Sequence, residues 1–402
     1  MPLPARHAQR GVALLLFVLV VIIAAAGVFL SAWNGTSARQ ARQQNAAMAL
    51  QQAKEAVIAH AAAVPDIDSL GYLALPDLGD ASFGAIKEGN ESGGFNGGNK
   101  DYTVIGKLPW SSLGIQPLRD QYGECLWYIV SGRFKNTPPT DVLNWDTPGQ
   151  IDIIDGNGTL IAGNVAAIVA APGPPLDGQN RTLADAAYTQ CGGNYIAANY
   201  LDPLDAANAI KGQFNYFSGS INNRVALDSG NKQFVMADSA HFNDRFLWVT
   251  ADDIFRPIMR RGDFALQISA LFDYFQAQIQ QPGFSIAGPR GTDKLTCPKP
   301  SFCQNWKEMF FLTQSRAPSP ACATVMIFAG QRTTGQSRAT PADKLDKKNY
   351  LEEPNLSAFA TPTALADGFD GPSVFTPNQP WKDIVKCIPE SINEAPSSQT
   401  VE

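Results

Sequence analysis

An uncharged apolar run, VALLLFVLVVIIAAAGVFLSAW, extends from Val12 to Trp33 and constrains this chain more than any other feature. At about 1.5 Å per residue, a helix of this span can cross a hydrocarbon core roughly 30 Å thick. The run is longer than the apolar core of about 7–15 residues in a cleaved secretory signal. Arg6 and Arg10 precede it, and positive charge before a span favours a cytoplasmic N-terminus. We therefore predict a single membrane pass, with the C-terminal part of the chain outside the membrane.

A second helical pattern follows this run, between Asn45 and Val64. Its apolar residues recur at spacings of three and four, which is typical of one helical face, and Pro65 then ends the pattern. We predict that residues 12–64 form one transmembrane and amphipathic rod behind a basic leader of residues 1–11. The apolar positions of the second pattern are Ala46, Leu50, Ala53, Val57, Ala61 and Val64.

The composition of the whole chain indicates a folded protein with little affinity for nucleic acid. Of its 402 residues, 45% are hydrophobic and 17% are charged, which is sufficient for one or two buried cores. The formal net charge is -6, whereas a general nucleic-acid binder carries an excess of Lys and Arg. We therefore expect no nucleic-acid partner.

The chain contains 6 cysteines, all beyond the apolar run. An even number on the predicted oxidising side of a membrane indicates disulfides, and six thiols allow 15 pairings. Buried free thiols are the alternative, and zinc is disfavoured because the sequence has no C-x-x-C pair and no histidine near the cysteines. The pairing that we favour joins Cys125 to Cys191, Cys297 to Cys303, and Cys322 to Cys387.

Turn and loop signals divide the remainder of the chain into four parts. Residues 65–101, which include GNESGGFNGGNKD, read as a flexible linker, and residues 102–281 read as an α+β head with a mixed, mainly antiparallel sheet. Residues 282–389 form a loop-rich, disulfide-bearing subdomain, and residues 390–402 a disordered tail. We expect strands at Tyr102–Ile105, Cys125–Val130, Gln150–Ile154, Thr159–Ile161 and Val165–Ala170, and helices at Leu183–Gln190, Leu204–Lys211 and Asp263–Gln280.

Three polar residues between two of these strands are a candidate calcium site. Asp152, Asp155 and Asn157 could supply the oxygen ligands that a hard cation prefers. Their spacing does not match the twelve-residue calcium loop, and Asp-Gly-Asn-Gly is a strong hairpin signal. We favour a solvated hairpin turn and keep calcium as the alternative.

Further along the chain, acids and arginines alternate around Pro257. Asp252 and Asp253 lie close in sequence to four arginines, which predicts a salt-linked surface helix. The arginines are Arg245, Arg256, Arg260 and Arg261. Aromatic residues in short strands more often fill cores than line interfaces. We apply this expectation to Trp110, Trp127, Tyr128, Trp145 and Trp248.

The sequence offers few residues for catalysis. The chain has 3 histidines, of which only His241 lies in the predicted head. No G-x-S-x-G, H-E-x-x-H or G-x-x-x-x-G-K-[ST] motif accompanies it. We therefore predict that the chain is not an enzyme and that it holds no cofactor, apart from the calcium alternative.

The segment QRGVALLLFVLV, a basic leader that ends in Gly11 before an apolar helix, resembles the type III signal of type IV pilins and type II secretion pseudopilins. The resemblance implies that prepilin peptidase cuts between Gly11 and Val12 and that Val12 is then methylated. It also implies a bacterial inner-membrane location, with other pilins as partners through the N-terminal helix. Head segments such as LRDQYGECLWYIVSG, LNWDTPGQ and FNDRFLWVTADDIF look like those of pilin-like proteins with large heads.

The chain departs from the family at two positions. Most pilins have a glutamate at the fifth mature residue, which here is Leu16, and many have a proline at the twenty-second, which here is Trp33. The family glutamate neutralises a buried terminal amine during assembly, and tip subunits such as the large K-type pseudopilin lack it. The resemblance therefore implies a tip or accessory subunit of a type IV pilus or type II secretion filament. The alternatives are a tip adhesin or substrate-recognition module and a membrane-anchored periplasmic enzyme.

Overall fold

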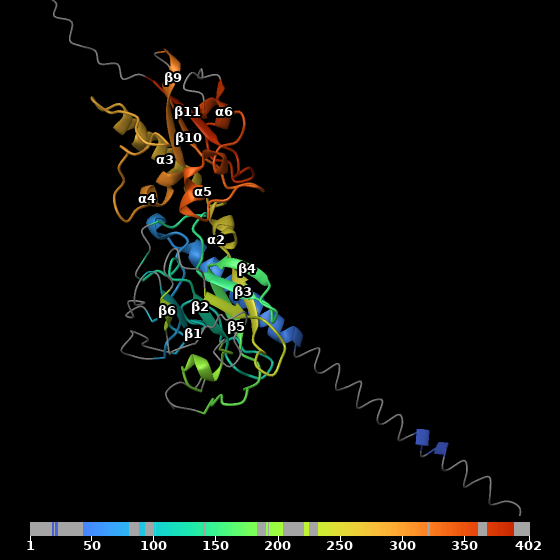
Figure 1. Cartoon of the computed structure of the whole chain (residues 1–402). Coiled ribbons are helices and arrows are strands. Elements are labelled where there is room, and N and C mark those ends of the chain that lie inside the picture. Colours follow the sequence, from blue (N-terminus) through green and yellow to red (C-terminus); the bar gives the residue numbers. More distant parts are fainter. Residues whose placement is uncertain are drawn as a thin grey trace, which may run out of the picture.

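The computed structural model describes residues 18–19, 21–22, 43–79, 88–92, 100, 102–137, 139, 142–182, 190–191, 193–203, 221–224, 232–319, 322–360 and 368–389. These residues form an α+β protein with several sheets, arranged as an N-terminal unit (described residues between 43 and 258) and a C-terminal unit (described residues between 262 and 389) (Figure 1). Most of the apolar run from Val12 to Trp33 lies outside the described residues, as do the leader and the tail after residue 389.

The structure corrects the predicted rod and its membrane anchor. In the part of the chain that is described, no helix has both the length and the apolar character needed to cross a membrane. The longest described helix, residues 43–63, carries polar and charged side chains such as Gln51, Gln52 and Glu55 on its exposed side, so it fails as a span. The fold class with a pilin-like transmembrane helix and the single-pass inner-membrane location are therefore wrong. The apolar stripe of the helix covers a protein sheet instead.

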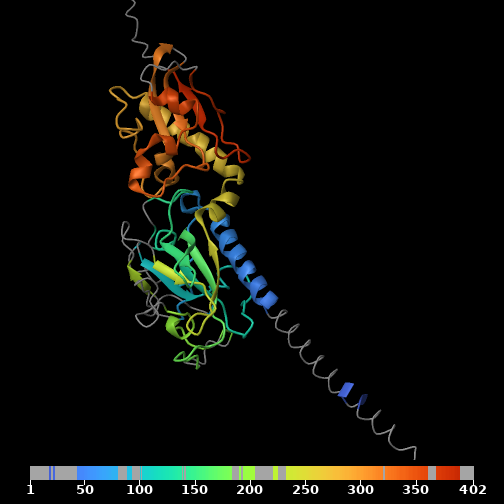
Figure 2. The ribbon, with the colours of Figure 1, turned by 45° about the vertical axis from the view of Figure 1, so that its right-hand side comes forward.

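The N-terminal unit is built on an antiparallel sheet that is buried on both faces. Successive residues of β2 and β5 contribute to different clusters, so the apolar runs of these strands reflect two covering layers. Tyr128 and Val169 pack with the helix of residues 43–63, which lies along the sheet in Figure 2, and Ile129 and Ile168 face the other way. In order across the sheet, the strands are β6 (Ile221–Arg224), β1 (Tyr102–Lys107), β2 (Trp127–Val130), β5 (Ala167–Ala171) and β8 (Arg245–Val249).

A smaller sheet covers the second face. Its order is β4-β3-β7, with β3 and β4 antiparallel and β3 and β7 parallel. Ile151, Ile153 and Phe234 of this sheet share one apolar cluster with Ile129 and Ile168 of the larger sheet. The bounds are β3 (Ile151–Ile154), β4 (Leu160–Val165) and β7 (Lys232–Val235), with short 3-10 turns η1 (Ile67–Ser69) and η3 (Ala197–Asn199) elsewhere in the unit.

The C-terminal unit places helix α3 on an antiparallel sheet of order β11-β10-β9. Phe272 and Phe275 of α3 contact Phe310 of β9, with ring centroids 5.1 and 4.9 Å apart. Helix α2 (Ala251–Ile258) ends the N-terminal unit and leads into this one. The elements of the C-terminal unit are α3 (Gly262–Ile279), α4 (Phe302–Trp306), η4 (Lys307–Met309), β9 (Phe310–Ser319), β10 (Cys322–Phe328), α5 (Pro341–Leu345), η5 (Lys347–Asn349), α6 (Asn355–Ala360) and β11 (Ile384–Ile388).

The two units share one apolar core. A single cluster of buried residues runs from Ala53 and Val57 of the N-terminal helix to Phe310 and Ile327 of the C-terminal sheet. Residues 70–78, which belong to the segment expected to be a flexible linker, are buried; Leu73 and Leu75 of this segment are part of the same cluster. The units are therefore packed together by the hydrophobic effect over a continuous surface.

The protein contains three disulfides, as the even cysteine count indicated. They join Cys125 to Cys191, Cys297 to Cys303 and Cys322 to Cys387, which are the pairs favoured from the sequence. Such bonds persist in oxidising compartments, so the chain has the features of a periplasmic or extracellular protein.

Candidate functional site

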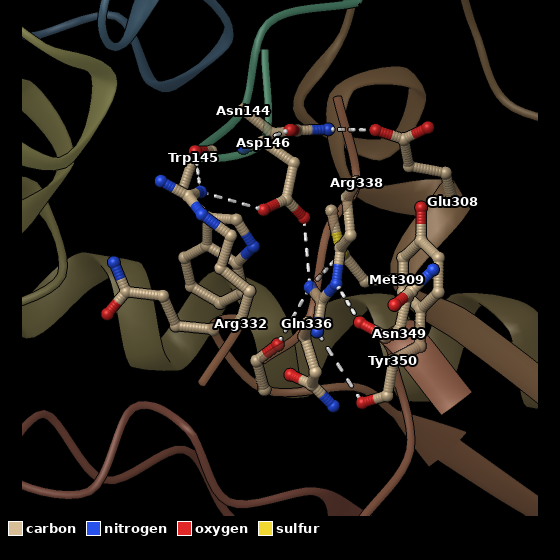
Figure 3. Close-up of polar contacts among 12 residues, drawn as sticks. Asn144, Trp145, Asp146, Glu308, Met309, Arg332, Gln336, Arg338, Asn349 and Tyr350 are labelled. Carbon is tan, nitrogen blue, oxygen red and sulfur yellow. Dashed lines mark hydrogen bonds and ion pairs between the residues drawn. The ribbon is translucent and has the colours of Figure 1, made fainter. Parts of the chain in front are cut away.

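The most elaborate polar site lies where the two units meet. Asp146 belongs to a loop of the N-terminal unit and Arg338 to a loop of the C-terminal unit, yet their side chains form an ion pair with an N–O distance of 2.9 Å (Figure 3). The side chain of Asp146 is 0% exposed and that of Arg338 is 1% exposed. Burial of both charges costs desolvation energy, which only close pairing and complete hydrogen bonding offset.

Local turn chemistry fixes the carboxylate in place. Asn144 Oδ1 accepts a hydrogen bond of 2.8 Å from the Asp146 backbone N–H, and the Asn144 C=O accepts one of 3.0 Å from the Thr147 N–H. These contacts form an Asx turn, a conformation that asparagine stabilises readily. The Asn144 amide also donates to the Asn305 C=O, at 2.8 Å, so the turn is attached to the C-terminal unit.

Arg338 donates hydrogen bonds to backbone groups of its own unit as well as to Asp146. Its guanidinium donates to the carbonyl oxygens of Gly330 (3.0 Å), Tyr350 (3.5 Å) and Asn349. It also lies 4.2 Å from the centroid of the Tyr350 ring. Burial, followed by the charge of Glu308, raises the pKa of Tyr350 to about 12. Arg338 is therefore held by backbone carbonyls and an aromatic ring before it meets the carboxylate.

A second arginine extends the network toward solvent. Arg332, with 31% of its side chain exposed, donates to Asp146 Oδ1 at 3.1 Å and to Asp252 Oδ2 at 2.8 Å. It also donates to the Trp145 C=O at 2.9 Å. Two carboxylates thus face two guanidinium groups, and the network is electrically balanced.

Aromatic packing surrounds the network on the side of the core. Trp145 is 0% exposed and packs edge-on against Trp306 of the C-terminal unit, with ring centroids 4.6 Å apart. The Leu143 N–H donates to Asn305 Oδ1 at 3.0 Å, which adds a further hydrogen bond between the units. Of the aromatic residues that we expected in cores, Trp127, Tyr128 and Trp145 are fully buried.

A cavity of about 320 Å³ adjoins the network, and the charged side chains that line it connect the two units. Asp146, Arg332 and Arg338 line it, but their charged atoms already pair with one another. The arrangement fixes the orientation of the two units relative to each other.

A different buried carboxyl group lies inside the N-terminal unit. Asp244 is 1% exposed, and its Oδ2 accepts a hydrogen bond from the Asp202 N–H at 2.8 Å. Its Oδ1 has no hydrogen-bond partner among the described residues. Burial, followed by the charge of Asp202, raises the pKa of Asp244 well above its usual range. Asp202 in turn accepts from the N–H groups of Asn243 and Asp244, at 2.6 and 2.9 Å, and burial raises its pKa.

The unit also buries a lysine. Lys107, at the end of β1, is 2% exposed, and its ammonium lies 4.3 Å from the ring centroid of Tyr195 and 5.5 Å from that of Tyr200. Burial lowers its pKa to about 8, although the charge of Asp77 opposes the shift. Asp77 accepts hydrogen bonds from the N–H groups of Gly79 and Gly89. Its backbone also pairs with that of Lys107, so Asp77 attaches Gly79 and Gly89 to the end of β1.

The structure does not assemble the candidate calcium ligands Asp152, Asp155 and Asn157 into a metal site among the described residues. The two aspartates accept hydrogen bonds from backbone N–H groups instead. Asp155 Oδ1 accepts from the N–H groups of Asn157 and Thr159, at 2.8 and 2.7 Å, as in a hairpin turn. Asp152 Oδ1 accepts from the Asn164 N–H at 3.0 Å. In the described ranges, no group of three or more His, Cys, Asp or Glu side chains could hold a metal ion.

Other candidates from the sequence do not form a site in the described residues. Gly11 and Val12, the predicted processing residues, lie outside them. His241 is exposed, in a turn where its backbone N–H donates to Ser239 Oγ at 3.2 Å. The predicted cleavage and methylation stay predictions.

Sequence reasoning missed the residues of the junction. Asp146 and Arg338 are 192 positions apart, so no local pattern connects them. One hint of this site is present in the sequence: Asp146 follows Trp145 directly and is the single charged residue between Val142 and Ile151. Comparisons of the chain with protein-family models, with curated proteins and with solved structures found no match.

Proposed function

We propose that the protein is a structural subunit of an exported pilin-like assembly, a type IV pilus or a type II secretion filament, and that it acts through contact. The observation that carries this proposal is the helix of residues 43–63. Its small-residue face, with Ala53 and Ala61 at 0% exposure, is docked on the sheet, while its opposite face is open to solvent. A helix held firmly by its own head can present the open face to neighbouring subunits.

Two further observations support a contact role. The shared core and the buried ion pair between Asp146 and Arg338 make the two units one body, as a load-transmitting subunit requires. The leader sequence before Val12 resembles that of the pilin class. The proposal includes prepilin peptidase and other pilin-like subunits as partners and does not include a membrane span.

The test of the proposal is the N-terminus of the mature protein. We expect mass spectrometry of protein from its native cells to find methylated Val12 as the first residue, and an intact leader in cells without prepilin peptidase. An unprocessed N-terminus in cells that have the active peptidase would contradict the proposal.

A crosslinking experiment tests the contact face separately. Met48 is 61% exposed on the helix, and Leu266 is 71% exposed on α3 of the C-terminal unit. We expect a bismaleimide to join M48C to other subunits of the assembly in cells, and L266C to serve as the control without such products. Equal crosslinking from both positions would argue against a helix-mediated contact.

A further inference from the structure

A polar groove on the outer side of the junction has the features of a binding site. Its volume is about 460 Å³, and it lies between α2, the loop that contains Arg332 and the loop before β11. More of its lining is polar than apolar, so it is unlike a protein-docking patch of the hydrophobic kind. The residues that line it include Arg256, Arg260, Arg332, Asp252, Asn378 and Trp381.

Two arginines give the groove a positive charge: Arg256 of α2 and Arg260 of the turn that follows this helix. Arg256 and Arg260 are four positions apart in sequence and exposed, and neither guanidinium has a hydrogen-bond or ion-pair partner in the described part of the chain. The acids expected to pair with them point elsewhere: Asp252 binds Arg332, and Asp253 binds Lys54 at 3.0 Å. The groove thus carries two guanidinium groups without partners among the described residues, although the chain as a whole has a net charge of -6.

An indole completes the groove. Trp381 is 43% exposed, and its loop is fixed by the backbone, because the Gln331 N–H donates to the Pro380 C=O at 2.7 Å. A Cβ atom on Gly330 would lie 2.1 Å from the Trp381 carbonyl oxygen, so this close approach requires glycine. Because the backbone of this loop is already ordered, a ligand that stacks on the exposed indole does not have to order the loop.

We propose that this groove binds an acidic polysaccharide. Guanidinium groups pair with carboxylate or sulfate groups in a bidentate manner, and an exposed indole offers its face to the C–H groups of a sugar ring. A nucleic acid could also stack on Trp381, but it needs many phosphate contacts for affinity, and this acidic chain offers few. This inference goes beyond the proposed structural role, and a binding measurement on the purified chain tests it without any assembly.

The experiment titrates purified full-length protein with heparin and polygalacturonate oligosaccharides, with neutral dextran and single-stranded DNA as comparisons. We expect binding to an acidic oligosaccharide that weakens as salt is raised, and no binding to dextran. The double variant R256A/R260A should bind at least about tenfold more weakly, and W381A about fivefold more weakly, with W381F closer to the wild type.

Matched controls remove the same kinds of side chain elsewhere on the surface. R245A/K348A removes two positive charges outside the groove, and Y122A removes an aromatic side chain that is 53% exposed. We expect both controls to bind like the wild type, and thermal melts to show that every variant is folded; R256Q/R260Q replaces the alanine pair if that pair is unstable. Absence of binding at millimolar oligosaccharide, equal loss in the controls, or tighter binding of single-stranded DNA would overturn the proposal.

Discussion

Asp146 and Asp244 are both buried aspartates, but the protein accommodates them in opposite ways. Asp146, at the junction of the two units, faces two guanidinium groups at 2.9 and 3.1 Å. Asp244, inside the N-terminal unit, faces another carboxyl group and accepts one backbone hydrogen bond. The first site compensates a charge, whereas the raised pKa of the second favours the neutral form of the side chain.

The contrast shows which buried carboxyl group couples the two halves of the molecule. The partners of Asp146 come from the C-terminal unit, so its charge is compensated only while both units are folded and docked. The contacts of Asp244 lie within the N-terminal unit, so its burial is independent of docking. Variants at Asp146 therefore test the contact between the units, and variants at Asp244 test the stability of the N-terminal unit.

The largest effect is expected from D146A. This change leaves Arg338 buried beside Gly330 and Tyr350 without a counter-charge, and breaking such a pair costs about 3–5 kcal/mol. Urea denaturation at pH 7 measures the loss of unfolding free energy. D238A, which removes an exposed partner of Arg245, is the control and should leave the midpoint unchanged. A loss in D146A no greater than in this control would remove the distinction between the two buried sites.

A double-mutant cycle sharpens this result. The cycle compares D146A, R338A and the double variant D146A/R338A. Both single variants break the same ion pair, so their losses of unfolding free energy should not add in the double variant. We expect a coupling of about 1–3 kcal/mol between the two side chains, from the same denaturation measurements. Additive losses would show that Arg338 acts through its carbonyl partners alone.

A smaller effect is expected from R332A. Its guanidinium is 31% exposed, so solvent screens the contacts with Asp146 and Asp252. We expect a loss of about 1–2 kcal/mol, and less at high salt than at low salt. A loss that is independent of salt would indicate packing as its cause.

The smallest effect, and the only gain, is expected from D244N. The raised pKa of Asp244 means that the folded wild-type protein holds a proton which the unfolded chain releases, so its stability falls as the pH rises from about 4 through the folded-state pKa. Asparagine cannot ionise, and D244N should be more stable at neutral pH, by on the order of 1 kcal/mol. Thermal melts between pH 4 and pH 8 should show the difference growing with pH. A difference that shrinks as the pH rises would contradict this account of Asp244.

Much of the fold follows from local patterns in the sequence. Alternating and continuous apolar segments predicted the positions of β1 and β5, a 3.6-residue period predicted α3, and the Asp155–Gly158 turn joins β3 to β4 as expected. These features depend on near neighbours in sequence. The expected helices at Leu183–Gln190 and Leu204–Lys211 fall almost entirely outside the described residues.

The junction and the rod could not be predicted in the same way. The ion pair between Asp146 and Arg338 depends on how two units dock, which no local period encodes. The stripe of Leu50 and Val57 was interpreted as the outer half of a rod, although a stripe on a helix fits a protein sheet equally well. Hydrophobic periodicity shows that a face is buried but does not identify what covers it.

The most direct test of the account is differential scanning calorimetry of the wild-type protein and D146A. If the two units form one body, the wild type should unfold in a single transition with equal calorimetric and van't Hoff enthalpies, and D146A should unfold at lower temperature with the two units separating into distinct transitions. Two separate transitions in the wild type, unchanged in D146A, would contradict the account.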